Sequence, residues 1–173
     1  MYRLLIILFM ITVSTISYAQ KCRYEKEMID GETELQIKRT EAVDVIRVNN
    51  QPFLIKAQCI GSRKYMKIRY YRYNGFEIRT NEPLEIFFTD DSSVKITARE
   101  MPESRSSSGF IQVSSMLVYD LTKEQYLQLL NKPAQAIKYY VEGGGFIREE
   151  IKKKYQGDLQ QIMRCVLLDT DNF

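Results

Sequence analysis

Apolar and polar residues alternate along most of the chain from Arg23 to Ala98, and this period of two is typical of strands with one buried face. Turn motifs such as Asn74-Gly75 and Gly61-Ser62 interrupt the alternation at short intervals. The pattern predicts a meander of short antiparallel strands. Its two most regular series are Phe53, Ile55, Ala57, Cys59 and Leu84, Ile86, Phe88.

The clearest hairpin lies between residues 84 and 98, where two alternating runs flank the polar turn at 89–93. The following segment, 100–109, is polar and contains Pro102 and three consecutive serines, so we expect a mobile loop there. Residues 110–119 are again typical of a strand.

Two helices are predicted near the C-terminus, separated by a hairpin around Gly143-Gly144-Gly145. Thr122 and Gln125 have the spacing of a capping box, and Asp158 and Gln161 repeat that spacing before the second helix. The chain therefore predicts a mostly β fold, an antiparallel β-sandwich or open barrel with two short helices near the C-terminus. An α+β arrangement is the alternative.

The first nineteen residues have the pattern of a secretory signal peptide. Arg3 precedes an apolar run at 4–11, and small residues occupy positions 17 and 19 before Gln20. We expect residues 1–19 to be removed and residues 20–173 to form a single β-rich domain that is secreted or periplasmic. A retained membrane anchor and a lipid on Cys22 are the alternatives, although Lys21 stands where a lipid-attachment signal requires a small residue.

The chain resembles a group of small exported proteins of Bacteroidota. Their signal peptide ends in Ala-Gln, as here at 19–20, and their strand-rich body ends in a capped helix, a hairpin and a final amphipathic helix. The corresponding capped segment here is Asp120-Leu121-Thr122-Lys123-Glu124-Gln125. The resemblance implies an exported β-rich protein, and the group supplies no established activity.

Composition excludes several kinds of chemistry. The 173 residues include no histidine, which removes His-based catalysis and every zinc site that needs imidazole. The formal charge is only +3, so we expect no nucleic-acid partner, and no second apolar run is long enough to span a membrane. Gly143-Gly144-Gly145 precedes a strand rather than a helix, so a hairpin turn is favoured over a phosphate loop. Asp90-Asp91 is interpreted as a turn, and the acidic residues at 169–172 as a frayed tail. The sequence predicts no cofactor and no metal site.

Five cations and four tyrosines interleave between Arg63 and Tyr73. On a strand, Met66, Ile68 and Tyr70 would face the core, while Tyr65 and Lys67 would share the solvent face with three further residues. Such a face could stack on sugars or pair with the phosphate or carboxylate groups of envelope polymers. An ordinary solvated strand is the alternative. The candidate ligand-binding residues are Arg69, Tyr71 and Tyr73.

Three cysteines allow one bridge in an oxidising compartment. Cys59 shares its parity with apolar neighbours, which favours a buried free thiol. We predict a disulfide between Cys22 and Cys165, which would tie down both ends of the chain, and the alternative is no bridge at all.

Two functions remain open at this stage. The first is a non-enzymatic envelope or extracellular protein that binds a polymer, such as an envelope glycan, or a protein partner. The second is a carboxylate-dependent hydrolase of glycans, with candidates such as Glu77, Glu85 and Asp120. Two carboxylates about 5–10 Å apart in a deep pocket would favour the enzyme.

The signal-peptide pattern makes a prediction that mass spectrometry can test. Protein secreted by the native host should begin at Gln20, with or without cyclisation to pyroglutamate, because Ser17 and Ala19 define the cleavage site. Intact-mass measurement checks this. A species that retains residues 1–19, or one that carries lipid on Cys22, would contradict it.

Overall fold

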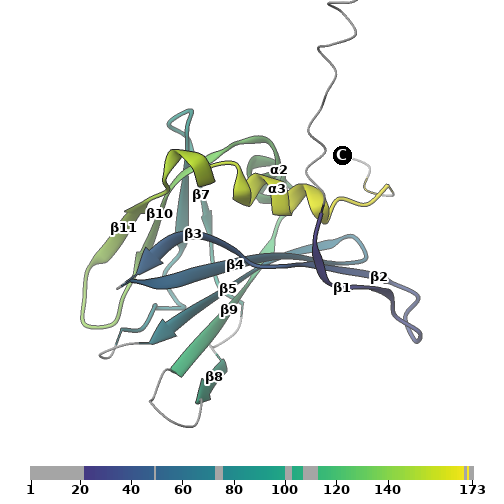
Figure 1. Ribbon diagram of the computed structural model, residues 1–173, viewed down its shortest axis with the longest axis horizontal. Helices are drawn as coiled ribbons and strands as arrows, with labels where there is room; N and C mark the ends of the chain where they lie inside the picture. Colours follow the sequence, from purple (N-terminus) through teal and green to yellow (C-terminus); the bar gives the residue numbers. More distant parts are fainter. Residues whose placement is uncertain are drawn as a thin grey trace, which may run out of the picture.

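The computed structural model describes residues 22–48, 50–72, 76–99, 103–106, 113–169 and 171 (Figure 1). For residues 72, 103–106 and 113 it describes the backbone alone. The predicted signal peptide at 1–19 and the predicted cleavage site lie outside the described residues.

Seven strands form the larger sheet, and every neighbouring pair is antiparallel. The order is β1-β2-β4-β5-β9-β8, and β3 pairs with the N-terminal half of β4 on the edge where β2 pairs with its C-terminal half. The strands are β1 (Tyr24–Ile29), β2 (Gln36–Thr40), β3 (Val43–Val48), β4 (Gln51–Ile60), β5 (Arg63–Arg72), β8 (Glu103–Ser106) and β9 (Val113–Leu121).

Four strands form the smaller sheet, in the order β11-β10-β6-β7, and they are also antiparallel. The hairpin predicted at 84–98 is present as β6 and β7, with Asp91 at φ 64° in its turn. The glycine hairpin is present between β10 and β11. The strands are β6 (Leu84–Phe88), β7 (Ser93–Ile96), β10 (Ala134–Tyr140) and β11 (Phe146–Glu150).

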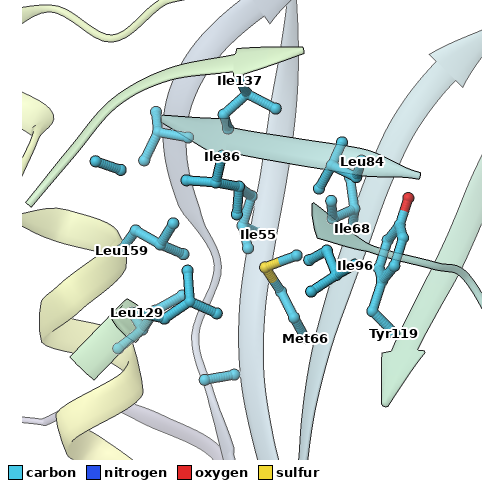
Figure 2. Close-up of a cluster of buried hydrophobic side chains, with 14 of the residues drawn as sticks. Ile55, Met66, Ile68, Leu84, Ile86, Ile96, Tyr119, Leu129, Ile137 and Leu159 are labelled. Atoms are coloured by element: carbon cyan, nitrogen blue, oxygen red, sulfur yellow. The ribbon is translucent and has the colours of Figure 1, made fainter. Parts of the chain in front are cut away.

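The two sheets pack face to face around one apolar core. Figure 2 shows Ile55, Met66 and Ile68 of the larger sheet meeting Leu84, Ile86 and Ile137 of the smaller one. The sheets join at one corner, where Ala98 forms a bridge with Tyr119 and the Arg99 N–H donates to the Val118 carbonyl at 2.8 Å. The barrel is not closed, so the predicted mostly β fold, with two antiparallel sheets and two short C-terminal helices, is confirmed.

Two helices, α2 (Lys123–Asn131) and α3 (Asp158–Cys165), lie together over one end of the sheets (Figure 1). The capping box of α2 is present as predicted: Thr122 Oγ1 accepts from the Gln125 N–H, and the Gln125 side chain accepts from the Thr122 N–H. The capping box predicted for α3 is wrong. Its N-cap is Gly157 without a side-chain bond, and Asp158 lies within the helix, where burial raises the pKa of its carboxyl group.

Part of the segment expected to be a mobile loop is a strand. Residues 103–106 form β8, which pairs with β9 from Glu103–Met116 to Ser106–Val113. The remaining residues of 100–109 lie outside the described part of the chain. The composition of this segment could not show the pairing. β5 occupies one edge of β9, and β8 pairs with the other edge, which is known only once the sheet is formed. Residues 152–156 contain the short 3-10 helix η1 (Lys153–Tyr155).

Cys22 and Cys165 form a disulfide with their Cα atoms 5.5 Å apart, which is the pairing that the sequence analysis favoured. Cys59 is a free thiol, completely buried, and burial raises its pKa. The Tyr24 hydroxyl donates to the Cys165 carbonyl at 2.8 Å. The start of β1 is therefore attached to the end of α3 by a covalent bond and a hydrogen bond.

Asp171 is not part of a frayed tail, as the sequence had suggested. Its Oδ2 lies 2.6 Å from Lys64 Nζ, and only 3% and 4% of the two side chains are exposed. The same oxygen accepts from the Leu168 N–H at 2.8 Å. Because a buried charge needs a partner, this pair explains how Lys64 can occupy the core-facing parity of β5.

The disulfide predicts a measurable loss of stability when it is removed. Its two cysteines are 143 positions apart, and a bridge over so long a loop restricts the unfolded chain strongly. The double variant Cys22→Ala/Cys165→Ala should lose roughly 2–5 kcal/mol in guanidinium unfolding. Non-reducing peptide mapping should show one thiol, Cys59, that alkylates only after unfolding. A bridge that contains Cys59, or three thiols in freshly secreted protein, would contradict the assignment.

Candidate binding face of the seven-stranded sheet

β5 places the candidate residues as its alternation predicts. Met66, Ile68 and Tyr70 are buried in the core, so Arg69 and Tyr71 point to the outer face of the sheet. Tyr73 lies outside the described residues.

The outward-facing side chains of β5 are less exposed to solvent than the side chains of an edge strand would be. Tyr65 is only 8% exposed, and Lys67, Arg69 and Tyr71 are half-buried, so the expectation that Tyr65 faces solvent is wrong. The reason is the position of β5 between two long neighbours. Tyr65, for example, lies between Gln58 of β4 and Asp120 of β9. The side chains of β4 on one side and β9 on the other restrict the movement of these half-buried side chains.

Four cations from three neighbouring strands gather on this surface, which we call the cationic face. Lys56 of β4 is the direct cross-strand partner of Lys67 of β5. Arg39 of β2 is the partner of Gln58, two residues from Lys56, and its Nε donates to Gln58 Oε1 at 2.8 Å. The cationic face consists of Arg39, Lys56, Lys67 and Arg69.

The carboxylate of Glu25, on the edge strand β1, responds to these cations. Its Oε2 lies 2.6 Å from Lys56 Nζ. The hydrogen bond from Lys56 is the main cause that lowers the pKa of Glu25, and the charges of Lys56, Arg39 and Arg69 lower it further. Glu25 therefore lies within electrostatic reach of cations on β2, β4 and β5.

Apolar side chains separate the charges of the cationic face. Arg69 has Leu54 and Met116 as its cross-strand partners, and Val118 is the partner of Lys67 on β9. All three apolar side chains are half-buried. The surface therefore combines positive charge with apolar contact area, and Tyr71 beside Ser114 extends it toward the end of the strand.

Like charges directly opposite each other on one face of a sheet destabilise the fold. The Lys56–Lys67 pairing is such an arrangement, and Glu25 offsets it on the side of Lys56. Two lysines that lie side by side on a surface can both contact one anionic group, which is a physical reason to look for an anionic ligand there.

The carboxylates proposed for a hydrolase do not come together. Glu85 lies on the outer face of the smaller sheet, 3.5 Å from Lys138 Nζ. Asp120 lies on the larger sheet, in an exposed ion pair with Arg99 at 3.3 Å. The Glu77 carbonyl accepts from the Glu142 N–H at 2.8 Å, outside both sheets.

Carboxylates do line a cavity between β3 and β11, the two edges between which the barrel stays open. The cavity has a volume of about 230 Å³, and Asp44, Glu149 and Glu150 lie on its wall with Arg47. Asp44 Oδ2 accepts from Arg47 at 3.2 Å, whereas its Oδ1 is buried without a hydrogen-bond partner among the described residues. Sequence analysis missed this group, because nothing in the sequence shows that these strand edges face each other.

Two further findings concern what the described part of the chain does not contain. It has no group of three or more Cys, Asp or Glu side chains arranged to hold a metal ion. None of its helices is long and apolar enough to cross a membrane.

Comparison of the chain with protein-family models, curated proteins and solved structures found no match.

The pKa of Glu25 provides a test of the cationic face in solution. An NMR titration should place it below the ordinary glutamate value, and Lys56→Met should raise it toward that value because the main hydrogen bond is lost. Because the pKa of Glu25 is lower in the folded state than in the unfolded state, the ionised carboxylate stabilises the fold at any pH above the unfolded-state value of about 4.3. This stabilisation is lost as the pH falls through the lowered folded-state pKa. The difference in Tm between wild type and Lys56→Met should therefore be present at pH 7 and vanish in acid. An unshifted Glu25 would contradict the arrangement.

Proposed function

We propose that this protein is an exported, non-enzymatic binding protein whose cationic face binds an anionic polymer of the cell envelope or the extracellular medium. The observation that carries the proposal is the direct cross-strand pairing of Lys56 with Lys67, extended by Arg39 and Arg69. Phosphate or carboxylate groups could form charge-assisted hydrogen bonds with several of these closely spaced cations.

The shape of the surface favours a polymer over a small molecule. The cations spread over three strands of an open sheet face, and strands lie about 4.8 Å apart. The hollows between β3 and β11, beside the disulfide and along α2 are lined by other residues. A chain with repeated negative groups can contact several of these cations at once, whereas a small anion would contact one or two.

Export is supported by two independent features. The N-terminal sequence has the order of a signal peptide, and the disulfide is of the kind that persists in oxidising compartments. Anionic polymers are abundant outside the cytoplasm, so the proposed location and the proposed ligand agree.

A glycan hydrolase is the weaker candidate. Its only structural support among the described residues is the cavity between β3 and β11, where the buried Asp44 Oδ1 has no partner. At about 230 Å³ this cavity is smaller than the roughly 300–1,000 Å³ of typical ligand pockets, and a glycan segment with a reacting bond needs more room.

The test uses the mature chain with two polymers, polygalacturonate as a carboxylate probe and polyphosphate as a phosphate probe. Wild type should bind at least one of them, and the affinity should fall steeply as salt rises from about 50 to about 200 mM. Lys67→Gln/Arg69→Gln should weaken binding about tenfold or more, because two charge-assisted contacts are lost. The Tm should change by only a few degrees, since these side chains are partly exposed.

The matched control is Lys153→Gln/Arg164→Gln, which removes the same charge from exposed positions on η1 and α3. This control should bind almost as well as wild type. If both double variants lost affinity equally, net charge rather than the cationic face would explain the binding, and the proposal would be overturned. Failure of the wild type to bind either polymer would also overturn it.

A further inference from the structure

The outer face of the smaller sheet carries an exposed aromatic ring at Phe146, the first residue of β11. Its side chain is 58% exposed, whereas the other aromatic side chains of this face, Phe87 and Tyr140, are half-buried. A large apolar ring left in water has no role in the core. The role of this ring must therefore come from the groups that it contacts at the surface.

The ring is held in place by two neighbours. Tyr140 is its cross-strand partner on β10, and the two ring centroids lie 6.2 Å apart in an edge-to-face arrangement. Lys138 Nζ lies 4.6 Å from the centre of the Phe146 ring and 5.4 Å from that of Tyr140. A ring fixed in this way loses little conformational entropy when a ligand stacks on it.

Three glycines form the turn that precedes Phe146. Gly143, Gly144 and Gly145 have φ values of 87°, 100° and 92°, which only glycine adopts without strain. A Cβ atom at any of them would meet nothing within 4 Å apart from its chain neighbours, so no other part of the protein packs against this turn at the glycine positions. The hairpin turn predicted for these glycines is confirmed.

A row of polar side chains crosses the sheet next to the ring. Arg148, Lys138, Glu85 and Lys95 are successive cross-strand partners from β11 to β7. Glu85 lies 3.5 Å from Lys138 Nζ and 3.9 Å from Lys95 Nζ, and Arg148 donates to Glu150 at 3.1 Å. The row therefore offers hydrogen-bond donors and acceptors side by side, and with Glu150 it carries three positive and two negative charges.

We propose that this surface is a second binding site, which takes a neutral glycan. The less polar face of a pyranose ring would stack on Phe146, because axial C–H groups are attracted to the negative face of an aromatic ring. Hydroxyl groups both donate and accept, so they suit the mixed row of Lys138, Glu85 and Arg148. The carboxylates of Glu85 and Glu150 would repel the negative groups of a polyanion, and this favours a neutral ligand.

This site is independent of the cationic face. The outer faces of two packed sheets point away from each other, so a single molecule presents an anion-binding surface on one side and the Phe146 surface on the other (Figure 1). Each site can be lost without loss of the other.

The experiment uses the ¹⁵N-labelled mature chain and three neutral probes, maltohexaose, laminarihexaose and chitohexaose, at millimolar concentrations. At least one of them should shift the amide signals of Gly143–Gly145, Phe146 and Lys138. Phe146→Ala should weaken binding about tenfold, and so should Phe146→Leu, which keeps an apolar side chain but removes the ring. Phe146→Tyr should bind like wild type because the ring is retained.

Leu167→Ala is the matched control, since Leu167 is 41% exposed just beyond the end of α3. It should bind like wild type, and all variants should keep the wild-type Tm and their binding to the anionic polymer. If none of the probes causes a shift, if the shifts lie elsewhere, or if Phe146→Leu binds as well as wild type, the proposal is overturned.

Discussion

The period of two in β4 and β5 is the constraint on which both the core and the cationic face depend. One parity, with residues such as Ile55 and Ile68, lies against the smaller sheet and is completely buried. The other parity necessarily points outward, which places Lys56 and Lys67 on one surface as direct partners. A slip of one residue between these strands would bury the lysines and expose the isoleucines, so burial of the core also fixes the register of the charged face.

Local sequence was sufficient for features that depend on neighbours along the chain. The alternation of β4, the turn at Asp90-Asp91, the glycine hairpin and the Thr122 capping box each involve residues a few positions apart. The contacts that the sequence did not reveal connect distant segments. Glu25 meets Lys56, Asp171 meets Lys64, and residues 103–106 pair with β9. No pattern in a single sequence fixes such pairings, because they depend on which strand edges remain free after the local hairpins have formed.

Both ends of the described chain are held by specific interactions, at positions where fraying would otherwise be expected. β1 is an edge strand with mostly exposed side chains, and by itself it buries little apolar surface. Cys22 and the hydroxyl of Tyr24 attach it to α3. At the other end, Asp171 forms a buried ion pair with Lys64 of β5. Since Glu25 lies on β1, this attachment also holds the carboxylate that pairs with Lys56 in its place.

The alternation of inward-facing and outward-facing residues has a consequence for binding in this sandwich of two sheets. Its core uses only the inner parity of each sheet, so each outer surface can acquire its own chemistry without altering the packing that it covers. Here one outer face collects cations, and the other combines the Phe146 ring with a polar row that contains both positive and negative side chains. If both sites bind polymers, the rigid core between them sets the distance at which an anionic chain and a neutral glycan are held together. The protein would then act as a cross-link, with an affinity for the composite material greater than that of either site alone.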